Sequence, residues 1–212
     1  MLGARGHTLR KENPMTRNTA SQLSTILSEE EYLAFERSSE IKHEFLSGHV
    51  YAMAGATREH NLITGNIAGE LRLQLRGKPC ETYSNDMRVR ISRTGLYTYP
   101  DVVVVCGTPL FLDDHRDTLI NPLLIIEVLS PSTEGYDRGE KFKYYRSIES
   151  FSEYMLIAQD KIAADHFVKQ DNIWTIREVE QEIRLITIPC LLDFSDIYDR
   201  VEFITEEKEP EK

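Results

Sequence analysis

Two short runs of aliphatic residues constrain the fold more strongly than any other feature of the sequence. Residues 102–106 and 123–126 contain no alternation of polar and apolar side chains, and such runs are typical of strands that are covered on both faces. Each run adjoins one carboxylate, since Asp101 precedes the first and Glu127 follows the second. We therefore expect a buried central sheet whose strands carry two acidic side chains.

The remaining patterns predict one α/β domain. Strands of the central sheet are expected at residues 80–84, 87–91, 97–106 and 123–129, with further short strands at 152–158, 164–168 and 173–178. Helices are expected at residues 28–39, 59–76 and 136–147, and a hairpin is expected from strands 42–46 and 50–54 around Ser47-Gly48. The domain should cover residues 23–203, between a flexible leader at 1–22 and an acidic tail at 204–212.

Length and composition exclude several classes of protein. A chain of 212 residues fits one domain with a sizeable core, and its apolar runs are too short to span a membrane. Residues 1–20 lack the order of a secretory signal, so we expect a soluble, cytoplasmic protein without membrane partners. The three cysteines, Cys80, Cys106 and Cys190, are widely spaced and include no C-x-x-C, which predicts reduced, packed thiols.

The distribution of charge matters more than its sum. A net charge of −10 argues against a protein coated with phosphate-binding lysines. Between residues 58 and 93, however, seven basic residues stand against four acidic ones, and the acidity is concentrated at residues 29–44 and in the tail. The middle of the chain is therefore compatible with a nucleic-acid partner.

Asp101 and Glu127 are the first candidates for chemistry. An ionised carboxylate beside a buried strand is costly unless it is paired, hydrogen-bonded or bound to a metal. Two of them on adjacent strands repel each other, and a hard divalent cation such as Mg²⁺ or Mn²⁺ relieves that repulsion. The alternative is that each is held by backbone N–H groups or by an arginine such as Arg88 or Arg90.

Lys141 is the third candidate. In the expected helix after Glu127 it shares an apolar stripe with Tyr144 or Tyr145 and with Ile148, so its side chain should face the sheet. An inward lysine close to two carboxylates can orient a water nucleophile or stabilise charge on a phosphate. The alternative is a snorkelling lysine whose stem packs while its ammonium group reaches water.

Several of these residues belong to a pattern that resembles a known family. The pattern consists of Tyr99-Pro100-Asp101, then Ile126-Glu127-Val128-Leu129-Ser130-Pro131-Ser132-Thr133, then Tyr136-Asp137 with Lys141 and Tyr145. It resembles the Uma2-like restriction endonucleases of the PD-(D/E)XK nuclease superfamily, over about residues 28–203. The resemblance implies a restriction-endonuclease-like core, which is a twisted mixed β-sheet flanked by helices, here with an N-terminal helix and hairpin.

The resemblance also implies roles for single residues. Asp101 and Glu127 match the two acids of the superfamily motif and are expected to bind Mg²⁺ or Mn²⁺, with the Val128 carbonyl as a further ligand. The position two residues after Glu127 holds Leu129, so the motif lysine is displaced to the following helix, where Lys141 stands.

Two further residues are accessory candidates. Glu44 matches an acidic position near the site of this superfamily, and its alternative is a hairpin carboxylate paired with Lys42 or a neighbour. His60, at the start of the long helix, is a candidate for positioning a phosphate, although a histidine in a first turn is more often a satisfied surface or core residue.

The predicted function is that of a metal-dependent endonuclease that hydrolyses DNA phosphodiester bonds. Two alternatives stay open: a non-catalytic nucleic-acid-binding or assembly module with the same fold, and a metal-dependent hydrolase of small phosphoesters. DNA is the expected partner, and a homodimer is one arrangement that would present two sites to a duplex.

Overall fold

The fold is organised around a mixed six-stranded sheet in the computed structural model, which describes residues 26–179 and 181–203. In spatial order its strands are β11 (Ile173–Val179), β10 (Ala164–Gln170), β9 (Glu153–Ala158), β8 (Leu124–Leu129), β6 (Val102–Cys106) and β3 (Cys80–Ser84). Strands β8 and β9 are parallel, whereas the other neighbours in this sheet are antiparallel. All residues of β8 and β9 are buried, as the absence of alternation in residues 123–126 predicts for β8.

Two smaller sheets accompany the central one. The five-stranded sheet has the order β2 (His49–Ala52), β1 (His43–Leu46), β5 (Leu96–Thr98), β4 (Arg88–Ile91) and β7 (Thr118–Leu119). A two-stranded sheet contains β12 (Glu182–Arg184) and β13 (Leu191–Asp193). The predicted N-terminal hairpin is present, since β1 and β2 pair through a turn in which Gly48 has a φ of 88°.

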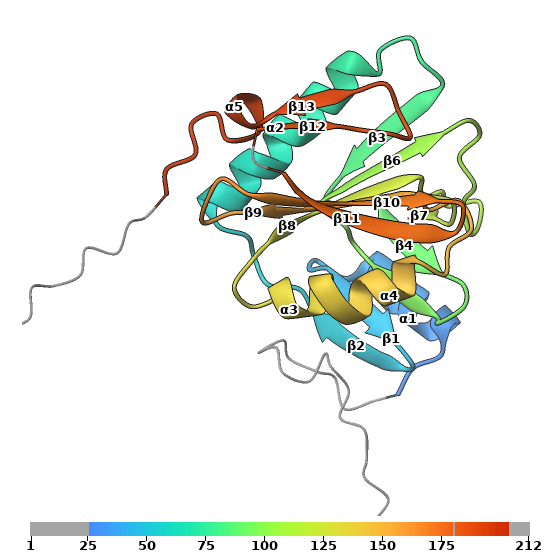
Figure 1. Ribbon diagram of the computed structural model, residues 1–212. Helices are drawn as coiled ribbons and strands as arrows, with labels where there is room; N and C mark the ends of the chain where they lie inside the picture. The colour runs from blue at the N-terminus through green and yellow to red at the C-terminus, as the bar shows by residue number, and fades with distance from the viewer. Residues whose placement is uncertain (1–25, 180, 204–212) are drawn as a thin grey trace, which may run out of the picture.

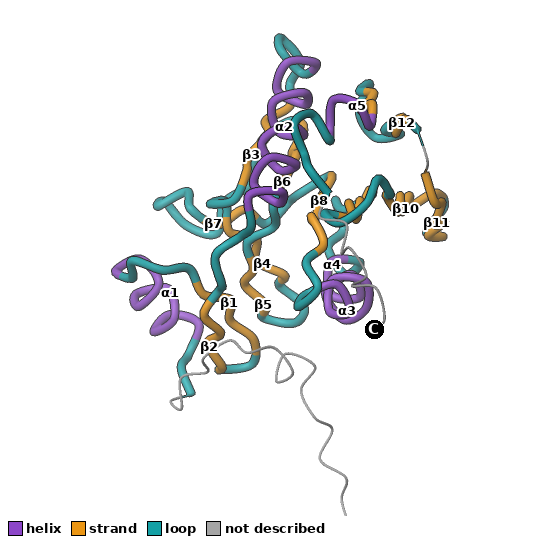
Figure 2. The backbone as a smooth tube through the Cα atoms, turned by 90° about the vertical axis from the view of Figure 1, so that its left-hand side faces the viewer, coloured by secondary structure: helices purple, strands orange, loops and turns teal. Residues whose placement is uncertain are grey.

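Helices cover the central sheet on both faces. They are α1 (Glu29–Ser38), α2 (Arg58–Gln74), α3 (Glu134–Tyr136), a π-helical turn (Asp137–Lys141), α4 (Phe142–Tyr145) and α5 (Phe194–Ile197). Helices α2 and α5 lie with β12 and β13 on one side of the sheet, whereas α1, α3, α4 and the β1–β2 hairpin lie on the other (Figure 1). The view turned by 90° shows α2 on one side and the hairpin with α3 and α4 on the other (Figure 2).

The first two helices begin where the sequence predicts. Ser28 caps α1 through a capping box with Glu31, in which each side chain accepts a hydrogen bond from the other residue's backbone N–H. Thr57 caps α2 by accepting from the backbone N–H of His60. This cap fixes the first turn of α2, which carries His60.

One prediction of a continuous strand was wrong. The strand expected at residues 97–106 is divided into β5 and β6, which belong to different sheets. Pro100 lies at the division, because proline lacks an N–H group and disfavours regular pairing. The helix expected at residues 136–147 is present as one continuous helical segment of α3, the π-helical turn and α4, and the π-helical turn was not predicted.

Two buried cores flank the central sheet. Side chains of α2, β12, β13 and α5 pack against one face, where Ile67, Val104 and Ile126 are fully buried. The other face packs against the five-stranded sheet and α4, with Tyr145, Phe151 and Tyr154 fully buried. Because Glu127 alternates with Ile126 along β8, its carboxylate points into the second layer.

The expectation of three reduced thiols was wrong for two of them. Cys80 and Cys106 lie directly opposite each other in the β3–β6 pair and form a disulfide. Spacing along the chain does not reveal such a cross-strand register, whereas Cys190 is a buried free thiol as predicted. No helix of the described part of the chain is long and apolar enough to cross a membrane. The predicted leader and tail lie outside the described residues.

Glu153 links three segments of the fold and generates a prediction about stability. Its fully buried carboxylate lies 2.6 Å from His166 Nε2 and accepts from the backbone N–H groups of Ile186, at 2.8 Å, and Thr187, at 3.0 Å. Burial raises the pKa of Glu153, whereas the hydrogen bonds from His166 and Thr187 lower it. The hydrogen bonds together outweigh burial, so the pKa of Glu153 lies below its ordinary value.

We predict that Glu153→Gln lowers the free energy of unfolding by about 1–3 kcal/mol near pH 7, because an amide cannot replace all of these acceptor bonds. The lowered pKa makes this contribution complete above the ordinary glutamate value of 4.5 and lost as the pH falls below it. Urea unfolding over a pH series measures it, with the exposed Glu178→Gln as control. Equal stability of the two variants at pH 7 would contradict the prediction.

Candidate active site

The pairing of β6 with β8 brings the two predicted acids together. Val102 lies opposite Ile126, so Asp101 and Glu127 are neighbours across the strand pair. The backbone N–H of Val128 donates to Asp101 Oδ2 at 2.7 Å, and that of Asp101 lies 3.4 Å from Glu127 Oε2. The backbone part of the alternative interpretation is therefore correct, since a backbone N–H group donates to each of the two acids.

The arginine alternative is wrong. Arg88 is paired with Asp117 at 3.1 Å and donates to the hydroxyl groups of Thr118 and Tyr99. Arg90 is paired with Glu29 at 2.9 Å. Neither arginine forms an ion pair with Asp101 or Glu127 in the described part of the chain, so the balancing charge for these two acids comes from elsewhere.

Lys141 supplies that charge to Glu127. Its Nζ lies 2.9 Å from Glu127 Oε1, 3.3 Å from Asp137 Oδ1 and 3.5 Å from Glu44 Oε1. Lys141 is only 6% exposed, so the snorkelling alternative is wrong. Lys143, two residues later, has a side chain that is 71% exposed and points outward. The helical spacing therefore predicts the direction of both lysines correctly.

The π-helical turn helps to place two of these groups. Asp137 and Lys141 begin and end this turn, and both are buried. A π-turn widens a helix locally, and such turns are frequent at functional sites. Here Lys141, at the end of the turn, contacts Glu127, and Asp137, at its start, contacts Lys141.

Glu44 comes to this cluster from the five-stranded sheet. It lies on β1 and accepts a hydrogen bond from the Thr98 hydroxyl of β5. Lys42, its suggested partner, instead pairs with Asp86 at 3.2 Å. Lys42 is therefore not the partner of Glu44, whereas Thr98 of the neighbouring strand is, and the contact of Glu44 with Lys141 joins the two sheets.

Two residues of the cluster received no role from the sequence. Asp137 contacts Lys141, and the Tyr145 hydroxyl donates to Glu127 Oε1 at 2.8 Å. Both stand in the family-like pattern, and Tyr145 also shares the inward stripe of Lys141. That stripe was a usable signal for Tyr145, whereas Asp137 needed the local π-helical geometry.

His60 lies at the more open side of the site. Its Nε2 is 3.3 Å from Asp101 Oδ2, and the two side chains are 14% and 16% exposed. Burial lowers the pKa of His60, whereas the hydrogen bond and the charge of Asp101 raise it. The effect of Asp101 outweighs burial, so the pKa of His60 lies above its ordinary value. Its Nδ1 is buried and has no hydrogen-bond partner among the described residues, which leaves a polar atom available to a ligand or to water.

The buried charges alter each other's titration. Burial raises the pKa of Glu127, Lys141 lowers it, and the charges of Asp137 and Asp101 raise it again, to about 8. Burial lowers the pKa of Lys141, but the surrounding acidic groups raise it well above its ordinary value. Lys141 therefore remains an ammonium ion, while the excess negative charge favours a proton or a cation at Glu127.

The residues present fit a hard divalent cation. In the described residues, no three His, Cys, Asp or Glu side chains converge as ligands for one ion. Mg²⁺ is often bound by only one or two carboxylates and keeps several waters. Asp101, Glu127 and the Val128 carbonyl offer oxygen donors of this kind, and acidic groups outnumber Lys141 around them. That they bind Mg²⁺ or Mn²⁺ stays a prediction.

The fold defines the class of the protein. The crystal structure of a putative nuclease belonging to DUF820 from Anabaena variabilis ATCC 29413 superposes with a TM-score of 0.66, covering 81% of this chain and 97% of that chain. Sequence identity is 14%, so the likeness concerns the fold alone. The predicted restriction-endonuclease-like architecture, with its twisted mixed sheet and flanking helices, is confirmed.

The sequence comparison defines the family. The model of the Uma2 family, described as putative restriction endonuclease, matches residues 29–199, and the chain belongs to this family. Uncharacterized protein sll1609 of Synechocystis sp. is 38% identical over 158 residues, which are 74% of this chain and 89% of that protein. Uncharacterized protein slr1290 of the same organism is 36% identical over 162 residues, with coverages of 75% and 83%.

The buried lysine generates a second prediction. Lys141→Met should lower the free energy of unfolding by about 3–5 kcal/mol near pH 7.5, because it leaves buried carboxylates without their counter-charge. Carboxyl groups with raised pKa values are protonated more readily in the folded state, so the loss should shrink as the pH falls to about 5. Urea unfolding without divalent cations measures both effects.

The matched control is Lys143→Met, on the same helical segment but exposed, which should change stability by less than about 0.5 kcal/mol. A loss in Lys141→Met that does not depend on pH would contradict the electrostatic explanation.

Proposed function

We propose that this protein is a metal-dependent endonuclease that hydrolyses phosphodiester bonds in DNA. The observation that supports this most directly is the 2.9 Å contact between Lys141 Nζ and Glu127 Oε1, with Asp101 on the adjacent strand. A positive donor beside two acids on neighbouring strands is suited to binding a phosphate and a hard cation together. A buried structural ion pair would not need the second acid or the partly exposed His60 beside it.

Asp101 and Glu127, with the Val128 carbonyl, would hold the Mg²⁺ or Mn²⁺ ion. Such an ion, when bound, lowers the pKa of water and neutralises charge on a phosphate. Lys141 keeps its proton and donates hydrogen bonds, so it can orient the attacking water or stabilise negative charge that develops on the phosphate. Tyr145 holds the Glu127 carboxylate in place through its 2.8 Å hydrogen bond.

Glu44, Asp137 and His60 have supporting roles in this proposal. Glu44 and Asp137 contact the Lys141 ammonium group and fix its direction. The raised pKa of His60 favours its charged form, which can hold a phosphate oxygen at the open side of the site. The Uma2 family is described as putative restriction endonuclease and the Anabaena protein as a putative nuclease, which supports a nuclease reaction with DNA as the partner.

Cleavage of supercoiled plasmid with Mg²⁺ or Mn²⁺ tests the proposal. Asp101→Asn, Glu127→Gln and Lys141→Met should each reduce the rate by at least about 100-fold, the scale of losing one preorganised charge in an active site. Asp86→Asn and Lys143→Met are the matched controls, because both residues are exposed, and they should cleave like the unmodified protein.

Equal cleavage by all of these proteins would contradict the assignment of the site. Absence of cleavage by the unmodified protein, together with no Mg²⁺ heat that depends on Asp101 in calorimetry, would favour the binding module. Preferential hydrolysis of small phosphoesters over plasmid in a competition assay would favour the other alternative.

A further inference from the structure

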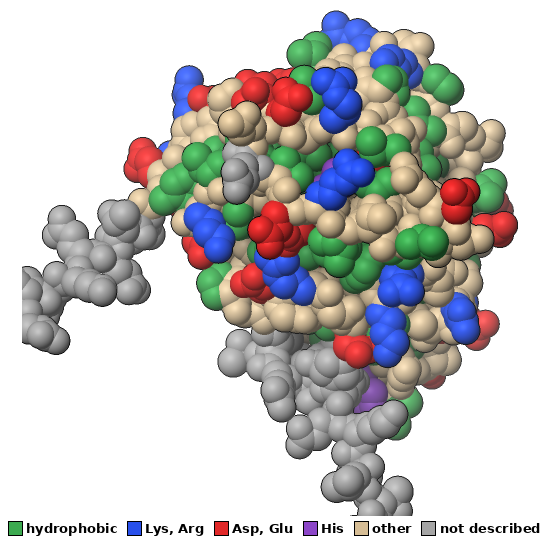
Figure 3. All heavy atoms as spheres, viewed as in Figure 1, with side chains coloured by type: hydrophobic (Ala, Val, Ile, Leu, Met, Phe, Trp, Pro, Cys, Tyr) green, Lys and Arg blue, Asp and Glu red, His purple; other side chains and the backbone are tan. Residues whose placement is uncertain are grey.

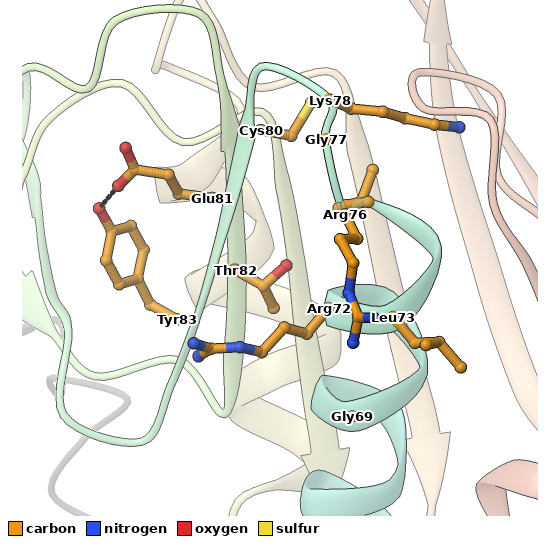
Figure 4. A pocket seen from close by; sticks show the side chains of 11 residues that line it. Gly69, Arg72, Leu73, Arg76, Gly77, Lys78, Cys80, Glu81, Thr82 and Tyr83 are labelled. Atoms are coloured by element: carbon orange, nitrogen blue, oxygen red, sulfur yellow. Dashed lines mark hydrogen bonds between the residues drawn. The ribbon is translucent and has the colours of Figure 1, made fainter.

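A hollow of about 840 Å³ lies between the last turns of α2 and the edge strand β3. Lys141 and the carboxylates around it do not line this hollow. It is lined by Arg72 of the helix, by Arg76 just after the end of the helix and by Thr82 of the strand. In Figure 4, Arg72 reaches from the helix toward β3, whereas Arg76 turns back along the helix and Lys78 extends away from both. Figure 3 shows positive side chains near the top of the molecule, where α2 ends in Figure 1.

Both arginines of the hollow lack an acidic partner among the described residues. Arg72 lies in the last turn of α2, whereas Arg76 lies just beyond the end of that helix at Gln74. Neither forms an ion pair within the described residues, whereas seven other arginines do: Arg37, Arg58, Arg88, Arg90, Arg138, Arg184 and Arg200. Glu81 also lines the hollow, but its carboxylate accepts a hydrogen bond from the Tyr83 hydroxyl. The hollow therefore keeps an excess of positive charge.

A second observation points to a ligand. The Thr82 hydroxyl is buried and has no hydrogen-bond partner among the described residues. Thr82 lies opposite Val104 in the β3–β6 pair, and Val104 packs in the core layer that contains α2, so Thr82 faces the helix that carries Arg72. A buried hydroxyl without a partner is unfavourable by about 1–3 kcal/mol, so the wall of the hollow beside the arginines carries an unsatisfied polar group.

We propose that this hollow binds a phosphate group of the nucleic-acid backbone, an inference that rests on the proposed function. Arginine guanidinium groups match phosphate oxygens in charge and in hydrogen-bond geometry. Strand β3 begins at this hollow and ends beside the candidate active site, where the Asn85 N–H donates to the Asp101 carbonyl at 3.0 Å. Five strand residues span roughly 15 Å, which corresponds to about four to five base pairs of duplex.

The test compares two double variants that remove the same charge. Arg72→Gln/Arg76→Gln changes the hollow, whereas Lys161→Gln/Arg177→Gln changes two exposed residues elsewhere. Binding of a fluorescent DNA duplex is measured by anisotropy in EDTA, over a salt series from about 50 to 200 mM. The hollow variant should bind about tenfold more weakly at low salt, and the slope of log affinity against log salt should become shallower by about one unit. The control should keep the unmodified affinity and slope.

Cleavage kinetics give an independent readout. With Mg²⁺, the hollow variant should raise KM and leave kcat unchanged, because neither arginine lies among the residues of the candidate active site. Suppose that Asp101→Asn cleaves like the unmodified protein, while the hollow variant still shows a shallower slope of log affinity against log salt. The proposed function then fails and the phosphate site stands. If plasmid is cleaved and the hollow variant keeps its affinity, slope and KM, the proposed function stands and the phosphate site fails.

Binding of inorganic phosphate, measured by calorimetry, distinguishes a site for the nucleic-acid backbone from a site for a free anion. Loss of phosphate binding in the hollow variant without any change in duplex binding would overturn the assignment to nucleic acid. Equal loss of duplex binding in both double variants would also overturn it, because the effect would then come from net charge alone. Failure of the unmodified protein to bind duplex at low salt would overturn it together with the proposed function.

Discussion

The contact between one buried ammonium group and three carboxylates holds the candidate site together. Lys141 is the charged group that allows Glu127, Asp137 and Glu44 to lie within one interior region, since carboxylates at such distances repel when no cation lies between them. Each carboxylate comes from a different segment of the chain. The same interaction therefore joins the five-stranded sheet, the central sheet and the helical segment after β8.

The central sheet adds a second constraint. Antiparallel pairing of β6 with β8 places Asp101 beside Glu127, and the Val128 N–H bond to Asp101 fixes this relation through the backbone. Helix α2 then presents its first turn to Asp101 through His60, and its last turns to the edge of the same sheet. Helix α2 and the central sheet thus connect the acidic site with the positively charged hollow.

Much of this arrangement could be predicted from the sequence. The two unalternating runs indicated buried strands, and the helical stripe gave the direction of Lys141. What failed depended on register or on local backbone geometry. The division at Pro100, the π-helical turn and the disulfide between Cys80 and Cys106 arise from long-range pairing and backbone conformation that side-chain periodicity does not encode. For the same reason Asp137 received no role before the structure was known.

The wide separation of the cluster along the chain has a consequence during synthesis. Glu44 is made early, whereas Lys141 follows only after the strands that carry Asp101 and Glu127. A growing chain has no assembled cluster until the segment after β8 has left the ribosome and docked between the sheets. The order of synthesis therefore leaves the acidic residues without their counter-charge until the chain has been made as far as Lys141.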